Sequence, residues 1–304
     1  MPADGPAPAP YRGRFAPTPS GPLHLGSLLT ALASWLQARS QGGLWLLRID
    51  DLDRPRCLPG ADAEILRQLE QHGLLWDESP RYQTTHVAEY EEALARLADL
   101  GLAYPCSCTR ARLATSSLPG PDGPVYDGHC RHAAASGRCA IRFRLPPEML
   151  QFHDGWLGLQ RRQAEAEVGD FTLRRSDGMI GYQLACAVDE IHQGITEVVR
   201  GSDLLGSTFR QIAVMHRLGW VPPAYRHGPL LQDATGLKLS KQNHAAPLAP
   251  ELASTNLLTC LRHLSQEPPT ELDGAGVPPI LAWALAHWRP QQLLSPASAS
   301  VELG

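Results

Sequence analysis

The sequence predicts an α/β protein whose open parallel sheet is built in two halves, separated by an insertion and followed by a short, mainly helical region. Three observations indicate this fold. Near residue 20, a loop rich in Pro and Gly separates a short apolar stretch from a run with helical periodicity. A compact apolar run at 44–49 ends at an acidic loop. From residue 101, a cysteine-bearing stretch without helical periodicity interrupts the pattern.

The first predicted elements flank the loop that runs from Arg14 to Ser27. Residues 11–15 predict a strand, and leucines at 28, 29, 32 and 36 recur at helical spacing. Ser27 is the predicted N-cap of this helix, and Gly26 allows a ligand to approach the backbone. Because the first amides of a helix are free donors, a strand, a glycine-bearing loop and a helix N-terminus often bind phosphate. His24 lies just before these amides.

The other elements follow from apolar periodicity and length. Strands are predicted over 44–49, 196–200 and 228–231. Helices are predicted over 60–72, 86–100, 208–218 and 278–288, and Gly219 fits the C-terminal cap of the third. The run 181–189 enters the core as either a helix or a strand. Asp50 ends the first of these strands, at the edge where open α/β sheets bind ligands.

These patterns divide the chain into five parts. Residues 1–10 alternate Ala and Pro and are expected to be disordered, as the tail from residue 295 is expected to be loose. The sheet domain occupies 11–100 and 166–245, and the insertion occupies 101–165. Residues 246–304 contain two arginines and no lysine. We therefore expect a short helical region there, without a basic surface for nucleic acid.

Composition excludes several classes of protein. A net charge of −4 argues against a uniformly basic nucleic-acid binder. No apolar run reaches the length of a membrane span, and the first residues do not form a signal peptide. We expect a cytoplasmic protein that has no membrane partner and acts as a monomer. Only two of its 27 basic residues are lysines, Lys238 and Lys241, which suggests a local need for a compact, flexible ammonium group.

Three of the seven cysteines are grouped, at Cys106, Cys108 and Cys130. In a chain without a secretion signal, such a group favours a metal site over a disulfide framework. Three thiolates leave one position of a tetrahedral zinc ion open, and His129 and His132 are the candidates by general ligand preference. One structural zinc ion would stabilise an insertion too small to bury a large core.

Two motifs carry a family resemblance. The stretch His24-Leu-Gly-Ser resembles the first signature of class I aminoacyl-tRNA synthetases, HIGH, and Lys238-Leu-Ser-Lys241-Gln resembles the second, KMSKS. The stretch that begins Arg14-Phe-Ala-Pro-Thr-Pro-Ser-Gly is similar to the glutamyl and glutaminyl branch. The resemblance covers about residues 11–245 and implies a Rossmann-like parallel sheet split by a zinc-bearing insertion.

The resemblance implies an ATP-dependent ligase and assigns roles to residues. His24 and Lys241 are the implied catalytic residues, and with Gly26 and Lys238 they would bind ATP, which arrives with Mg²⁺. Arg200 would read the γ-carboxylate of L-glutamate and Asp50 would hold its amine, where the family usually has Glu. The implied glutamate site comprises Arg14, Phe15, Ala16, Pro17, Thr18, Asp50, Tyr182 and Arg200.

The insertion and the short C-terminal region narrow the resemblance, since residues 246–304 are not expected to form the basic anticodon-binding domain of the glutamyl-tRNA synthetases. The cysteine spacing with Tyr126-Asp-Gly-His-Cys130 is similar to the zinc site of the glutamyl-Q tRNA(Asp) synthetases, which implies Tyr126 rather than a histidine as the fourth ligand. That branch activates glutamate without tRNA and transfers it to queuosine at the wobble position of tRNA(Asp). Two alternatives are a glutamyl-tRNA synthetase fragment that charges tRNA(Glu) and a non-catalytic synthetase-like binding module.

Overall fold

A computed structural model describes residues 10–132, 135–231 and 246–294. Its first sheet contains the parallel strands β1 (Arg12–Phe15), β2 (Leu44–Ile49) and β3 (Asp77–Tyr82), with β2 in the middle. Residues 12–15 of β1 pair with residues 44–47 of β2. Both strands lie where the sequence predicts them, because their apolar side chains are buried on both faces of the sheet.

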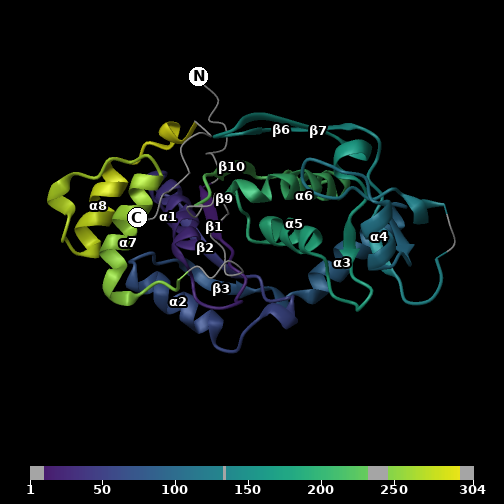
Figure 1. Cartoon of the computed structure of the whole chain (residues 1–304), viewed down its shortest axis with the longest axis horizontal. Helices are drawn as coiled ribbons and strands as arrows, with labels where there is room; N and C mark the ends of the chain where they lie inside the picture. Colours follow the sequence, from purple (N-terminus) through teal and green to yellow (C-terminus); the bar gives the residue numbers. More distant parts are fainter. Residues whose placement is uncertain (1–9, 133–134, 232–245, 295–304) are drawn as a thin grey trace, which may run out of the picture.

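The second sheet has the order β7-β6-β10-β9. Strands β9 (Glu197–Gly201) and β10 (Ala224–Gly228) are parallel, and β6 (Met149–Asp154) and β7 (Gly158–Gln163) form an antiparallel hairpin along β10. The amide of Thr196 donates to the carbonyl of Arg12 at 2.9 Å, which places the start of β9 beside β1. The carboxyl ends of β1 and β9 therefore lie next to each other at the centre of the molecule (Figure 1).

Helices cover both sides of these strands and confirm the predicted α/β class. They are α1 (Leu25–Ser40), α2 (Ala61–Gln71), α3 (Val87–Asp99), α5 (Tyr182–His192) and α6 (Leu205–Arg217). One part of the core joins α1 to β1 and β2 through residues such as Leu32 and Trp45, and another joins α3, α5 and α6. The ambiguous run at 181–189 is thus helical, and Gly219 follows the C-cap of α6 with a φ of 74°.

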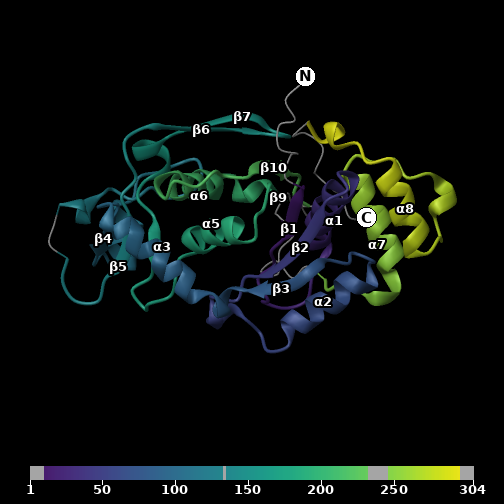
Figure 2. The same ribbon diagram turned by 180° about the vertical axis from the view of Figure 1, so that it is seen from behind.

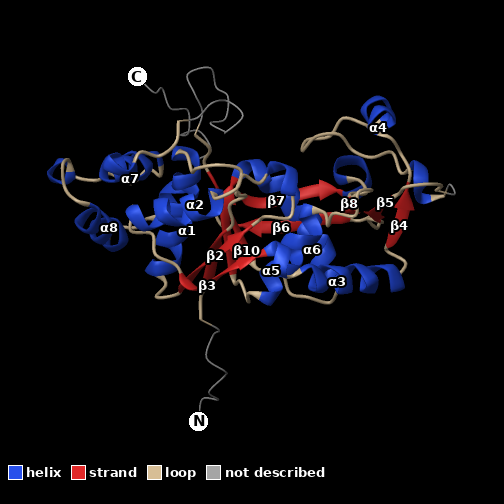
Figure 3. Ribbon diagram, turned by 90° about the horizontal axis from the view of Figure 1, so that it is seen from below, coloured by secondary structure: helices blue, strands red, loops and turns tan. Residues whose placement is uncertain are grey.

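A third, antiparallel sheet lies at the far end of the molecule, beyond α3 and next to the short helix α4 (Arg110–Ser116) (Figure 3). Its strands are β4 (Ala103–Cys106), β5 (Ala140–Phe143) and β8 (Thr172–Arg174), in the order β4-β5-β8. The hairpin β6–β7 also falls within 101–165, but it belongs to the central sheet through its pairing with β10. Shorter helical turns occupy Arg54–Arg56, Gln83–Thr85, His129–Arg131, Ala164–Val168, Ser202–Leu204, Pro250–Leu252, Thr270–Leu272 and Pro290–Leu294.

The C-terminal region is helical, as predicted. Helices α7 (Ala253–His263) and α8 (Val277–Ala286) pack against α1, at the end of the molecule opposite α4 (Figures 1 and 2). Buried side chains such as Leu257, Leu261 and Ile280 join the core around α1. Within the described ranges, no helix is long and apolar enough to cross a membrane.

One predicted strand was misplaced, and one strand of the first sheet was not predicted. The strand expected at 228–231 lies at 224–228, because Pro229 has no amide to donate and the pairing with β9 ends at Gly228. Strand β3 was not predicted, because its sequence Asp-Glu-Ser-Pro-Arg-Tyr is polar and contains Pro80. An edge strand tolerates such residues, and β3 lies at the edge of its sheet. The predicted tails and the loop at 236–242 lie outside the described residues.

Candidate active site

A cavity of about 400 Å³ lies where β1 and β9 end and α1 and α5 begin. This cavity brings together most of the described residues that the sequence predicts to bind glutamate or ATP, although the segments that carry them lie almost 190 residues apart in sequence. Asp50, itself described, does not belong to its lining. The nominated residues that line the cavity are Arg14, Phe15, Ala16, Pro17, Thr18, His24, Gly26, Tyr182 and Arg200.

The N-terminus of α1 opens toward this cavity. His24, not Ser27, is the N-cap: its Nδ1 accepts a hydrogen bond from the Ser27 amide at 3.2 Å. The predicted cap was therefore wrong, because the imidazole satisfies this amide from three residues earlier. The first turn of α1 carries no acidic side chain. The positive end of the helix dipole and the remaining amides thus provide a place for an anionic group.

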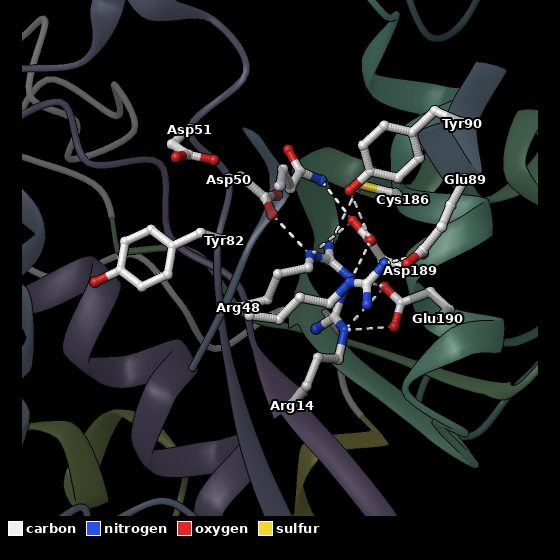
Figure 4. Close-up of polar contacts among 12 residues, drawn as sticks. Arg14, Arg48, Asp50, Asp51, Tyr82, Glu89, Tyr90, Cys186, Asp189 and Glu190 are labelled. Carbon is white, nitrogen blue, oxygen red and sulfur yellow. Dashed lines mark hydrogen bonds and ion pairs between the residues drawn. The ribbon is translucent and has the colours of Figure 1, made fainter. Parts of the chain in front are cut away.

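Arg14 is buried and neutralised. Its Nε donates to both carboxylate oxygens of Glu190 on α5, at 3.0 and 3.1 Å, and its Nη1 donates to the carbonyl of Val199 at 3.3 Å. Burial acts to raise the pKa of Glu190, but Arg14 and Arg48 hold that pKa below its ordinary value. The carboxylate is therefore ionised at neutral pH and fixes Arg14 against the wall of the cavity (Figure 4).

Arg48 organises a second set of buried charges behind Arg14. Its Nε donates to Asp50 Oδ1 at 2.7 Å, and Asp189 and Glu190 lie 3.5 and 3.2 Å from its nitrogens (Figure 4). Asp50 is thus held by Arg48 rather than exposed in the cavity. Burial raises the pKa of Asp50 to about 6, although Arg48 acts in the opposite direction.

The sequence contains a signal for this charged core that the predictions did not use. Arg48 interrupts the apolar run Leu-Trp-Leu-Leu-Arg-Ile of β2, and Asp189 and Glu190 interrupt the apolar face of α5. Charged residues seldom lie inside such runs unless they are paired. Asp189 also accepts hydrogen bonds from Arg81 at 2.7 Å and from Tyr90 at 2.8 Å, so it links α3 and β3 to the site.

Arg200, the last residue but one of β9, is also buried, but its contacts differ from those of Arg14 and Arg48. Its Nε donates to His227 Nε2 at 3.2 Å, its Nη1 to Gln211 Oε1 at 2.9 Å and its Nη2 to Thr208 Oγ1 at 2.6 Å. Its guanidinium also lies 5.4 Å from the centre of the Tyr225 ring. No carboxylate in the described part of the chain forms an ion pair with Arg200.

His227 is held in one protonation state behind Arg200. Its Nδ1 lies 2.6 Å from Asp154 Oδ2, at the end of β6. Burial lowers the pKa of His227, so its ring is neutral at pH 7, although Asp154 acts to raise that pKa. With the ring proton on Nδ1, Nε2 is left as an acceptor, and it lies 3.2 Å from Nε of Arg200 and 2.9 Å from the hydroxyl oxygen of Thr208.

Tyr182 begins α5 at the border between two hollows. It is 41% exposed and also lines a groove of about 510 Å³ that extends toward α4 and Arg210. The preceding Gly181 is required there, because a Cβ atom would lie 2.4 Å from the carbonyl oxygen of Thr172. Lys238 and Lys241 fall outside the described residues.

The three grouped cysteines form a candidate metal centre. The sulfur atoms of Cys106, Cys108 and Cys130 all lie within 4.8 Å of one another, and no histidine or carboxylate in the described ranges completes this group. The hydroxyl of Tyr126 lies 3.5 Å from the sulfurs of Cys106 and Cys108. Nε of Arg142 donates to the Cys106 sulfur at 3.2 Å.

This donor set fits zinc. Zn–S bonds of about 2.3 Å and Zn–O bonds of about 2.0 Å in a tetrahedron separate sulfur from oxygen by about 3.5 Å. That is the separation between the Tyr126 hydroxyl and two of the sulfurs. The Cys130 amide also donates to the Tyr126 oxygen at 2.8 Å, so the phenol is already turned into the cluster.

Comparisons with known proteins agree with this arrangement. The family model for the catalytic domain of class I tRNA synthetases (E and Q) matches residues 11–251. A glutamyl-Q tRNA(Asp) synthetase from Pseudomonas fluorescens is 48% identical over 279 residues, which cover 91% of this chain and 92% of the relative. One from Methylococcus capsulatus is 45% identical over 300 residues, which cover 97% of this chain and 96% of the relative.

Solved structures show the same fold. A glutamate tRNA ligase from Elizabethkingia meningosepticum, crystallised in complex with its amino acid, superimposes with a TM-score of 0.79 at 23% identity. The match covers 96% of this chain and 67% of that one. A glutamate-tRNA synthetase from Elizabethkingia anophelis gives a TM-score of 0.80 at 22% identity, with coverage of 97% and 68%.

Proposed function

Because this chain belongs to the glutamyl-Q tRNA(Asp) synthetases, a group of class I tRNA synthetases and thus ATP-dependent ligases, we propose that it activates L-glutamate without tRNA and transfers it to queuosine in tRNA(Asp). One observation carries this proposal. A single cavity holds the N-terminus of α1 and a buried arginine, Arg200, that pairs with no carboxylate among the described residues. The arginine suits the side chain of glutamate and the helix N-terminus suits the phosphates of ATP.

Glutamate would bind between Arg200 and the Arg14 end of the loop. The γ-carboxylate would pair with Arg200, whose two terminal nitrogens each keep one N–H beyond the bonds to Gln211 and Thr208. The ammonium group would be held by the negative charge of Asp50. Since Asp50 does not line the cavity, we propose that a water molecule bridges the two groups.

Activation would consist of one displacement at phosphorus. An α-carboxylate oxygen of glutamate attacks the α-phosphorus of ATP, the bond to the bridging oxygen of the β-phosphate breaks, and pyrophosphate leaves with Mg²⁺. No proton transfer is needed. The amides of α1 and the His24 ring would stabilise negative charge on the phosphate oxygens, as would Lys238 and Lys241, which lie outside the described residues.

Transfer would follow by acyl exchange. A hydroxyl of the cyclopentenediol ring of queuosine attacks the carbonyl carbon of glutamyl-AMP, an ester bond forms, AMP leaves with the bonding electron pair, and the hydroxyl proton passes to solvent water. The exposed Tyr182, which lies between the cavity and the neighbouring groove, supports approach of the RNA from that side. Since an adenylate is already reactive, positioning of the two groups would supply most of the rate.

The direct test uses labelled glutamate, ATP and purified tRNAs. We expect label on tRNA(Asp) that contains queuosine and none on tRNA(Asp) that lacks it. A glutamyl-tRNA synthetase fragment would instead place the label on the 3′ end of tRNA(Glu), and a non-catalytic module would label neither. Either result would overturn the proposed transfer. The predicted cytoplasmic location and monomeric state stay predictions.

For the insertion, we propose one structural zinc ion held by Cys106, Cys108, Cys130 and Tyr126. The ion would hold β4, the start of α4 and the turn at His129–Arg131 together, where few apolar side chains are buried. We expect one zinc per wild-type chain and none in Cys106→Ser. Tyr126→Phe should bind zinc more weakly, whereas His129→Ala, the matched control, should bind like the wild type. Loss of zinc in His129→Ala alone would reject Tyr126 as the fourth ligand.

A further inference from the structure

Arg200 differs from the other buried arginines beside the cavity in the charge of its partners. Arg14 contacts the carboxylate of Glu190, and Arg48 contacts three carboxylates. Arg200 is 3% exposed, yet its three hydrogen-bond acceptors are an imidazole, an amide oxygen and a hydroxyl. None of these groups carries a negative charge that could neutralise it.

The negative charge closest to Arg200 through hydrogen bonds is Asp154, and His227 stands between them. Asp154 lies 2.6 Å from Nδ1 of His227, and Nε2 of the same ring accepts from Nε of Arg200 at 3.2 Å. The carboxylate is also occupied by the amides of Trp156 and Leu157, both at 2.9 Å. Asp154 therefore holds the ring but does not contact the guanidinium.

The fold fixes this row of three side chains. His227 on β10 pairs directly with Arg200 on β9, so their side chains lie on the same face of the sheet. Asp154 ends β6 opposite Tyr225, two residues before His227 on β10. The hairpin β6–β7 thus supplies one buried residue behind Arg200, although Asp154 lies 73 residues before His227 in sequence.

A buried cation without a counter-ion is costly, and an incoming carboxylate removes that cost. A carboxamide of the same shape does not, because it carries no charge. If a carboxylate of the protein touched Arg200 instead, the site would already be neutral and would lose its preference for a charged substrate. A neutral acceptor in this position holds the guanidinium in place and leaves its charge available.

We propose that His227, fixed by Asp154, is a positioning residue that holds Arg200 as a cation that no carboxylate of the described residues contacts, and that it thereby makes the site select glutamate over glutamine. This inference rests on the proposed function. His227 acts only through Arg200 and is not a catalytic residue.

The test measures ATP–pyrophosphate exchange by the full chain with glutamate and with glutamine. In His227→Ala we expect the KM for glutamate to rise about tenfold or more, the loss typical of one hydrogen bond to a charged group. The preference for glutamate over glutamine should fall with it, while the KM for ATP stays unchanged. His227→Gln, which offers a neutral amide oxygen to Arg200, should restore most of the affinity for glutamate.

The variant His227→Glu tests the opposite change, in which Arg200 gains a carboxylate partner. A carboxylate beside Arg200 should neutralise it, so that glutamate loses its advantage over glutamine. The matched control is His72→Ala. His72 is fully buried, its Nδ1 donates to the Gln68 carbonyl at 2.7 Å, and it lies outside the cavity, so its loss should lower stability without changing either KM.

The outcomes separate the two proposals. If the wild type shows no exchange with glutamate, the proposed function fails. If the wild type is active but His227→Ala lowers only the thermal midpoint and the active fraction, as His72→Ala would, this inference is overturned. The same holds if His227→Glu keeps the preference of the wild type for glutamate.

Discussion

The arginines on the two sides of the cavity use the same functional group for different purposes. On one side, Arg14 and Arg48 share Asp50, Asp189 and Glu190, so their charges are balanced by the protein. On the other side, Arg200 has only neutral acceptors. Balanced charges hold the strands and α5 together, whereas an unbalanced one is available to a ligand. Burial of an arginine thus does not indicate its role; the charge of its partners does.

The largest expected effect follows removal of the unbalanced arginine. Arg200→Leu should lower kcat/KM for glutamate in pyrophosphate exchange by about 1000-fold, because a buried charge pair with the substrate is lost. The free energy of unfolding should change by less than about 1 kcal/mol, because removal of a buried charge that no described carboxylate contacts offsets the loss of its three hydrogen bonds. Pyrophosphate-exchange kinetics test the predicted loss of kcat/KM, and urea denaturation of the same preparation tests the predicted stability. If Arg200→Leu were destabilised as strongly as is expected for Arg14→Leu, Arg200 would be a structural arginine like Arg14.

The next effect concerns a balanced arginine. Arg14→Leu leaves the buried carboxylate of Glu190 with Arg48 as its remaining partner, which should destabilise the fold by about 3 kcal/mol. Replacing both partners, Arg14→Leu with Glu190→Leu, should recover much of this loss because no charge is left unpaired. Urea denaturation of the three chains measures it. If Arg14→Leu is as stable as the wild type, Arg14 is not a structural arginine.

A third effect, about tenfold, concerns pH. Asp50 has a pKa of about 6, raised first by burial, so it is mostly ionised at pH 7 and mostly protonated at pH 5. Only the ionised form attracts the ammonium group of glutamate. The KM for glutamate should therefore rise about tenfold from pH 7 to pH 5.

The matched control for this profile is Asp50→Asn, which has no carboxyl group to titrate. Its KM for glutamate should be high and nearly flat across the same pH range. A wild-type KM that does not change between pH 7 and pH 5 would remove Asp50 from the glutamate site.

The smallest effect is expected at Cys186. Its sulfur accepts a hydrogen bond from Nη2 of Arg48 at 3.4 Å, but Arg48 is already balanced by carboxylates. Cys186→Ala should cost about 1 kcal/mol of stability through lost packing and leave the KM for glutamate unchanged. Thermal unfolding and exchange kinetics measure the two quantities. A changed KM for glutamate in Cys186→Ala would mean that the side of the cavity with Arg14 and Arg48 also recognises the substrate.

The sequence was sufficient for the parts of the fold that rest on local patterns. Strands β1 and β2 and helix α1 follow from apolar periodicity, and Arg14, His24 and Arg200 share one cavity because neighbouring strands of a parallel sheet end at the same edge. The α/β class was confirmed for the same reason.

What the sequence could not give depends on packing between distant segments. Asp154 lies 73 residues before His227, on a hairpin whose pairing with β10 no local pattern indicates. Arg200 was nominated without the neutral partners that define its environment. Asp50 was expected in the cavity, but the pairing with Arg48 turns it into the charged core. These outcomes depend on which side chains meet, and spacing along the chain does not specify that.

The most direct test of the account is pyrophosphate exchange by the wild-type chain in the absence of any tRNA, with glutamate and glutamine compared at the same concentration. The account predicts exchange with glutamate and almost none with glutamine, because only a carboxylate balances Arg200. Equal exchange with both amino acids would contradict it, as would exchange with glutamate that appears only when tRNA is added.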